Sequence, residues 1–285
     1  MNKAIIGACF AAPMVMAPLI VAAPGASLPA AGLQRLGYSL TSEALVMIPS
    51  MNQDWLDLSK SLYLVPNGFP EDSVPTFLQV PETGDLNASL AGAQAILIDA
   101  IETRWTDGNF SADDPLYVFG YSQNAVAAGL TEQHLSEFGI PQDALHFVMV
   151  GDSASSQGGF LSGFVDTLLK FFPESWRPDV TQLIEQFAQA AHIDSSIGLI
   201  TPDNLYPTDV YTLTGDGFAN WDDGANLGGL FWDHLAYLGL TPDEINTAGE
   251  PFKDGLTNYF TIDSGNVDML TALMNSFDMV ASPFV

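Results

Sequence analysis

Short apolar runs alternate with segments of helical periodicity along this chain. Four segments bounded by turn-forming residues are predicted to be strands: residues 43–50, 115–120, 144–151 and 206–215. Between them, residues 85–105 and 124–139 place apolar side chains at helical spacing, with Asp85 positioned to cap the first helix and Gly139 to end the second. This alternation predicts an α/β fold, with a mostly parallel sheet and helices on both faces.

Two further apolar segments, residues 61–69 and 75–82, end at Pro and Gly and are predicted to be extended. A long insertion, about residues 155–205, separates the last two strands. It contains two amphipathic segments rich in Phe and Leu, residues 158–176 and 179–193. We expect helices there, which either pack on the sheet or form a lid and acyl-chain wall over a site, because insertions of this length usually have a function.

The composition narrows the choice of partners. The chain has 285 residues, 47% of them hydrophobic, which is enough for a substantial core. Its 34 acidic residues outnumber the 7 basic ones, which gives a net charge of −27. A surface this acidic repels nucleic acid and anionic lipid headgroups, so we expect no nucleic-acid partner and a neutral or weakly charged substrate.

The N-terminus has the pattern of a signal peptide. Lys3 is followed by an almost uncharged apolar stretch to about Ala23, and small residues that suit cleavage come next, near residues 26–32. Residues 1–32 are therefore predicted to direct export to the outside of the cell or to its envelope, with a membrane anchor as the alternative. Residues 33–285 are then predicted to form a single α/β domain, with the helical insertion within it.

Cysteine, metal and cofactor chemistry find no support in the sequence. The only cysteine, Cys9, lies in the predicted signal peptide, so the mature chain has no thiol for a nucleophile, a disulfide or a metal site. No Gly-rich phosphate loop or dinucleotide motif is present. The acidic pairs at 113–114 and 222–223 lack ligand spacing and are interpreted as solvated loop residues. We expect neither a cofactor nor a metal.

A candidate nucleophile lies where the strand at 115–120 runs into the following helix. The junction reads Gly120-Tyr121-Ser122-Gln123-Asn124, close to the G-x-S-x-G turn that holds the serine of α/β hydrolases in a strained backbone conformation. Gly120 fits that motif. Asn124 replaces its second glycine, although Asn tolerates unusual dihedral angles and begins helices well. Ser122 is either a nucleophile or a structural serine.

A nucleophilic serine needs a histidine base, which in α/β hydrolases follows the serine and an acid along the chain. His234 is the one histidine late enough to satisfy that order. The other three lie on the helix after Ser122, at the start of a strand, and in the insertion: His134, His146 and His192.

The acid is expected at the end of a late strand. Asp216 directly follows the strand at 206–215 on a turn flanked by glycines, and Asp222 competes with it. Asp233 is too close in sequence to orient His234. An oxyanion hole would use the backbone N–H of Gln123 and a second N–H from the loop after the first strand, at Ser50 or Met51.

Several stretches in order resemble the PE-PPE domain family of mycobacterial serine hydrolases. They are YVFGYSQNAVAA, FVMVGDSASSQGGFLSGF, LYPTDVYTLTGDGFANW, HLAYLGL and TNYFTIDSGNVDMLTAL, within about residues 43–280. The resemblance implies an α/β-hydrolase fold, with Ser122 as nucleophile, Asp216 as acid and His234 as base. It also implies acyl-ester or lipid substrates, and for some relatives trehalose-lipid assembly in the cell envelope.

Three functions follow from these observations. The first is a secreted serine esterase or lipase. The second is an acyltransferase that uses the same triad to pass an acyl group to a sugar hydroxyl of the trehalose type. The third is a non-catalytic envelope protein that retains the fold, since fold alone does not determine function.

Overall fold

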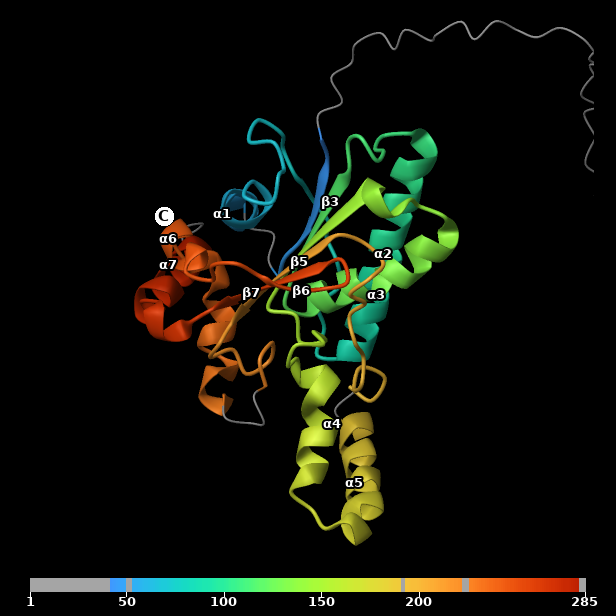
Figure 1. Cartoon of the computed structure of the whole chain (residues 1–285), viewed down its shortest axis with the longest axis vertical. Coiled ribbons are helices and arrows are strands. Elements are labelled where there is room, and N and C mark those ends of the chain that lie inside the picture. The colour runs from blue at the N-terminus through green and yellow to red at the C-terminus, as the bar shows by residue number, and fades with distance from the viewer. Residues whose placement is uncertain (1–41, 50–52, 191–192, 222–225, 282–285) are drawn as a thin grey trace, which may run out of the picture. The chain divides into compact units, whose positions relative to one another are not determined.

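The computed structural model describes residues 42–281, apart from 50–52, 191–192 and 222–225. The predicted signal peptide, residues 1–32, lies outside the described residues. Seven strands form one sheet in the order β2-β1-β3-β4-β5-β7-β6, and every neighbouring pair is parallel except β6 with β7 (Figure 1). The strands are β1 (Ala44–Met47), β2 (Thr76–Phe77), β3 (Leu116–Tyr121), β4 (Leu145–Val150), β5 (Thr208–Leu213), β6 (Phe252–Asp254) and β7 (Thr257–Ile262).

Helices cover both faces of this sheet. They are α1 (Gln53–Ser59), α2 (Leu86–Asp107), α3 (Gln123–Phe138), α4 (Phe160–Lys170), α5 (Arg177–Ala190), α6 (Pro242–Asn246) and α7 (Met269–Ala281). Helices α2 and α3 lie on one face and α1, α6 and α7 on the other (Figure 1). The predicted α/β-hydrolase-like fold is thus confirmed. No helix in the described part of the chain combines the length and apolarity that a membrane crossing needs.

Two hydrophobic cores explain why the central strands β1, β3 and β4 are almost entirely apolar. In β3, Tyr117, Phe119 and Tyr121 enter the core beneath α1 and α7, whereas Leu116 and Val118 enter the core beneath α2 and α3. Successive side chains of a strand point to opposite faces, so a strand buried on both faces has no polar alternation. This is the pattern from which the sequence predicts a parallel sheet.

The strand order reverses beside β1. From β1 the chain moves to β2 on one side and then returns to β3 on the other. In open parallel sheets, ligands bind at such a reversal, at the carboxyl ends of the strands. The residue directly after β3 is Ser122, so the topology places this serine at the expected binding edge.

The predicted helix boundaries at Asp85 and Gly139 are confirmed. The Asp85 carboxylate accepts the N–H of Ala88 at 2.9 Å, and Gly139 ends α3 in the left-handed region with φ +94°. The extended prediction for residues 61–69 is wrong, because α1 continues into a π-helical turn at Lys60–Leu64. A short apolar run such as this one fits a buried strand and a buried helical turn equally well.

In the other segment predicted to be extended, residues 75–82, the strand β2 covers Thr76–Phe77, and the N–H of Leu78 continues the pairing with the carbonyl of Val46 at 2.9 Å. The antiparallel edge strand β6 is not predicted by the sequence pattern. Its three residues, Phe252–Asp254, are all exposed, so they carry no buried apolar alternation that would mark a strand.

Helix α2 offers a matched pair of neighbouring residues for testing the core. Leu97 is fully buried, whereas the preceding residue, Ile96, is 37% exposed. We expect Leu97→Ala to lower the free energy of unfolding by about 2–5 kcal/mol, because it removes buried methyl groups and leaves a cavity. Ile96→Ala should cost less than about 1 kcal/mol. Urea denaturation of both variants measures the difference, and equal losses would contradict this packing.

Candidate active site

Ser122 occupies a strained turn between β3 and α3. Its φ of 61° and ψ of −130° make it the one non-glycine residue with positive φ in the described part of the chain. A Cβ at Gly120 would lie 2.5 Å from the carbonyl oxygen of Asn124, so only glycine fits there. Strain of this kind costs about 1–3 kcal/mol and persists where the surrounding structure holds it in place. The turn therefore has the geometry of a nucleophile elbow.

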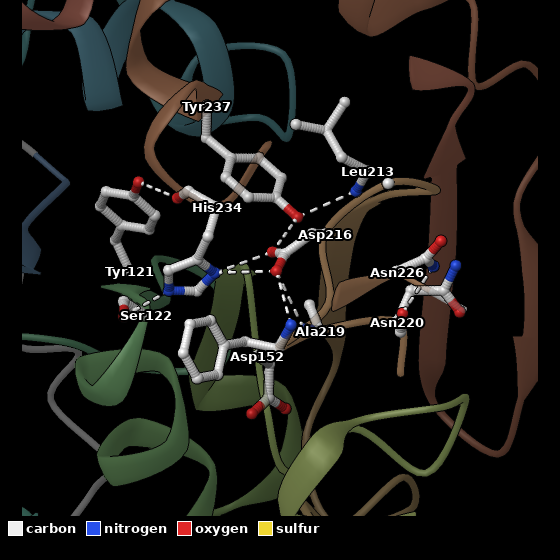
Figure 2. A network of polar contacts seen from close by, with 12 residues as sticks. Tyr121, Ser122, Asp152, Leu213, Asp216, Ala219, Asn220, Asn226, His234 and Tyr237 are labelled. Carbon is white, nitrogen blue, oxygen red and sulfur yellow. Dashed lines mark hydrogen bonds and ion pairs between the residues drawn. The ribbon is translucent and has the colours of Figure 1, made fainter. Parts of the chain in front are cut away.

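The structure brings Ser122, His234 and Asp216 together in one chain of hydrogen bonds (Figure 2). The Ser122 Oγ lies 2.7 Å from Nε2 of His234, and Nδ1 of the same ring lies 2.8 Å from Oδ2 of Asp216. An ionised carboxylate only accepts, so Nδ1 carries the proton and Nε2 is left to accept from the serine. Only 18 residues separate His234 from Asp216, and the 3₁₀ turns at 227–235 bring the chain back within this distance.

Asp216 is completely buried, and donors surround it. Besides the His234 ring, Oδ1 accepts the N–H groups of Phe218 at 2.8 Å and Ala219 at 3.2 Å. Oδ2 accepts the hydroxyl of Tyr237 at 2.8 Å. A buried carboxylate is costly unless hydrogen bonds replace its water, and this set of donors provides them.

Two tyrosines support the triad geometry, and sequence reasoning did not single them out. The Tyr237 hydroxyl donates to Asp216 and accepts the N–H of Leu213 at 2.9 Å, and the Tyr121 hydroxyl donates to the backbone carbonyl of His234. Burial, followed by the charge of Asp216, keeps the pKa of Tyr237 well above its ordinary value, so the hydroxyl remains a donor. The one sequence feature that points to them is their closeness to the triad residues along the chain: Tyr121 precedes Ser122, and Tyr237 lies three residues after His234.

One of the predicted oxyanion-hole donors, the N–H of Gln123, lies in the described part of the chain. Gln123 is the first residue of α3, so its N–H lies at the helix N-terminus, where backbone donors have no partner within the helix. That is the place expected for one of the two donors. The other candidates, Ser50 and Met51, lie outside the described residues.

Asn124, the departure from the glycine of the motif, is buried in the first turn of α3. Its side-chain amide donates to Oε1 of Glu82 at 3.1 Å, whereas its own Oδ1 has no partner within the described residues. Burial raises the pKa of Glu82 despite this hydrogen bond. The asparagine side chain therefore fills space beside α3 and joins the serine turn to the loop that follows β2.

The structure does not bring the other candidate histidines and acids that it describes into the hydrogen-bonded chain of Ser122. His134 pairs with Glu102 at 2.8 Å, and His146 pairs with Asp209 at 2.6 Å at the start of β4 and β5, the end of the sheet opposite Ser122. His192 and Asp222 lie outside the described residues. The Asp233 carboxylate packs against Gly215 and Gly229 instead of the His234 ring. Within the described ranges, no group of three or more His, Cys, Asp or Glu side chains could hold a metal ion.

An apolar cavity of about 330 Å³ opens beside Ser122. Helix α4 contributes Phe160 and Leu161 to its wall, and Ile193 comes from just beyond α5. The remaining lining residues are Leu86, Gln123, Val126, Ser153, Phe218 and His234. Small-molecule sites have this character, with an apolar wall and a few polar groups at one point. The helical insertion thus forms one side of the candidate site.

The insertion is also tied to the loop that carries Asp216. The N–H of Phe160, the first residue of α4, donates to the carbonyl of Phe218 at 2.8 Å. The N–H of Trp221 donates to the carbonyl of Gly158 at 2.6 Å. These two bonds join the start of α4 to the loop that carries Asp216.

The chain is similar to a known protein family and to two mycobacterial proteins. A family model described as the PE-PPE domain matches residues 68–273, a range that includes Ser122, Asp216 and His234. An uncharacterized PPE family protein of Mycobacterium tuberculosis, PPE28, is 28% identical over 214 residues. The esterase PE16 of the same organism is 29% identical over 151 residues.

These relatives are longer than the matched regions. The PPE28 match covers 69% of this chain and 28% of that protein, and the PE16 match covers 47% of this chain and 24% of that protein. Among solved structures, a lipase-esterase related protein from Clostridium acetobutylicum aligns with 9% identity and a TM-score of 0.38. That alignment covers 85% of this chain and 94% of the other.

A second buried carboxyl lies beside the triad. Asp152 follows Gly151, at which a Cβ would lie 3.3 Å from the His234 ring. Asp152 accepts the hydroxyl of Thr201 at 2.7 Å and the N–H of Ala154 at 2.9 Å. Thr201 lies beyond α5, so this carboxyl joins the two ends of the insertion. Burial raises the pKa of Asp152 from 3.8 to about 6.

The raised pKa makes stability depend on pH in a defined direction. The folded state binds the Asp152 proton more tightly than the unfolded chain, so its contribution is complete below about pH 4 and is lost as the pH rises to about 6. Asn cannot ionise, and its amide can still bond Thr201 and Ala154. We expect Asp152→Asn to be more stable than the wild type by about 1–3 kcal/mol at pH 8, with no such gain at pH 4. Urea unfolding across this range tests it, and a pH-independent difference would contradict it.

Proposed function

Because this chain belongs to the PE-PPE domain family, we propose that it is a serine esterase that cleaves acyl esters through an acyl-enzyme on Ser122. The fold is that of esterase- and lipase-type hydrolases, and one relative in the same family is named an esterase. The observation that carries the proposal is the hydrogen-bonded chain from Ser122 through His234 to Asp216, with the serine on a strained turn.

The proposed reaction follows from the positions of these atoms. Ser122 Oγ attacks the ester carbonyl carbon while Nε2 of His234 takes the hydroxyl proton, and Asp216 stabilises the imidazolium that forms. The N–H of Gln123 donates to the developing oxyanion. His234 then gives its proton to the departing alcohol, which leaves Ser122 acylated. Water, deprotonated by the same ring, attacks the acyl-enzyme, and the acid is released as the proton returns to Ser122.

The apolar lining of the cavity indicates that the protein binds the acyl group of the substrate there. Its wall is made mainly of aliphatic and aromatic side chains, and the polar groups gather at Ser122, Gln123, Ser153 and His234. An acyl chain placed along the wall would bring its carbonyl to the polar end. The net charge of −27 also favours uncharged substrates over anionic ones.

Acyl transfer is the second candidate, and the cavity supports it as well. The same acyl-enzyme can be resolved by a sugar hydroxyl instead of water, and an acyl chain bound along the apolar wall would exclude water from the side of the acyl carbonyl that it covers. Product analysis with an acyl donor and trehalose separates the two reactions. Free acid as the sole product supports hydrolysis, and acylated sugar supports transfer. Export and association with the cell envelope remain predictions from residues 1–32.

Replacing the nucleophile tests the proposal directly. We expect Ser122→Ala to lower kcat for a nitrophenyl acyl ester by roughly 10⁴-fold or more, because no other group can form the acyl-enzyme. Labelling by a fluorophosphonate probe should be lost together with the hydrolysis.

Ser153 provides the matched control, because it lines the same cavity and lies outside the triad. Ser153→Ala should retain labelling at the wild-type site. If Ser122→Ala is labelled as well as the wild type, the assignment of the nucleophile is wrong. If the folded wild type is neither labelled nor active on any ester tested, the chain is a non-catalytic member of the fold.

A further inference from the structure

The two helices of the insertion form a hairpin whose outer face is apolar and exposed. Helices α4 and α5 lie side by side, joined by residues 171–176 (Figure 1). We call residues 160–190 the α4–α5 hairpin. Four of its large apolar side chains are mostly exposed: Phe171 by 72%, Trp176 by 61%, Leu183 by 67% and Phe187 by 62%. Exposed apolar groups gathered on one element mark a binding surface more often than chance exposure does.

Helix α5 has two apolar sides. Ile184 and Ala188 are buried within the hairpin, which accounts for one side. Trp176 ends the 3₁₀ turn that leads directly into α5, and Leu183 and Phe187 follow it at spacings of seven and four residues, so the three form a stripe along another side of the helix. This stripe runs back from the turn for most of the length of α5, about 21 Å at 1.5 Å per residue. Packing inside the hairpin does not explain it.

The turn of the hairpin is close to neutral in a strongly acidic chain, because two basic residues there match Glu174 and Asp179. The whole chain has seven Lys and Arg residues, and two of them, Lys170 and Arg177, flank the turn beside Phe171 and Trp176. Aromatic residues with adjacent Lys or Arg are typical of segments that lie at a lipid–water interface, where the rings enter the acyl boundary and the cations meet headgroup phosphates. A second copy of this chain would bring another charge of −27, which opposes pairing of two such acidic molecules.

We propose that the α4–α5 hairpin docks on a zwitterionic or uncharged lipid surface through Phe171 and the stripe of Trp176, Leu183 and Phe187. The hairpin connects this surface to the candidate site, because Phe160 and Leu161 at its base line the cavity beside Ser122. The acidic remainder of the protein disfavours anionic headgroups, so neutral or zwitterionic lipid is the matching partner. The proposal concerns binding alone and does not depend on the chemistry at Ser122.

Vesicle sedimentation tests this proposal. The full chain with Ser122→Ala, which leaves the lipid intact, is mixed with phosphatidylcholine vesicles. We expect the vesicles to carry it down, and expect Phe171→Ser, Trp176→Ser and Leu183→Gln together to lower the partition coefficient by about tenfold or more. When the same three substitutions are made in the protein that retains Ser122, it should hydrolyse a water-soluble nitrophenyl ester at the wild-type rate, because none of the three residues lines the cavity.

A control variant removes three exposed apolar groups from other parts of the protein. Val74→Ser, Phe138→Ser and Phe252→Ser together change three exposed side chains away from the hairpin, and this variant should sediment like its parent. The proposal is overturned if the parent does not bind vesicles, or if the two triple variants lose binding equally. It is also overturned if the hairpin variant changes only self-association in analytical ultracentrifugation, because the stripe would then face a second copy.

Discussion

A carboxylate removed from water must be surrounded by donors, and the structure around Asp216 is organised by that requirement. Its partners come from its own loop, from the turn that carries His234 and from Tyr237. Tyr237 extends the arrangement, because its hydroxyl also binds the N–H of Leu213 at the end of β5 and its carbonyl accepts the hydroxyl of Tyr63. One buried charge therefore connects the sheet, the histidine turn and the π-helical segment.

The sequence predicts those features of the fold and the site that leave a pattern in neighbouring residues, and it does not predict those that depend on contacts between distant residues. The strand before Ser122 is a continuous apolar run, and the strand before Asp216 mixes apolar residues with Thr and Asp. The order of serine, acid and histidine along the chain singles out His234. Tyr121 and Tyr237 gave no comparable signal, because their contacts join positions far apart in sequence, and a tyrosine within an apolar run looks like any core residue. The helical turn at 60–64 was mistaken for extended chain for a related reason, since its three consecutive buried residues have no clear period.

The serine turn shows which part of a motif carries the physical constraint. At position 120 the neighbouring backbone leaves no room for a side chain, so glycine is required. At position 124 the space beside α3 accommodates an asparagine, which bonds Glu82. A motif with glycine at both positions thus combines a steric requirement at one position with a preference at the other, and this turn separates them.

The hydrogen bonds between the base of α4 and the acid loop limit how the insertion can move. Phe218 holds Asp216 with its N–H and holds Phe160 with its carbonyl, so the start of α4 and the Asp216 carboxylate share one peptide segment. A lid hinged at that point would strain the bonds that hold the acid each time it opened. Rigid-body swinging about the first turn of α4 is therefore opposed. A movement of the hairpin that left Asp216 in place would therefore have to bend α4 and α5 beyond that first turn, so that the hydrogen bonds among Ser122, His234 and Asp216 kept their alignment.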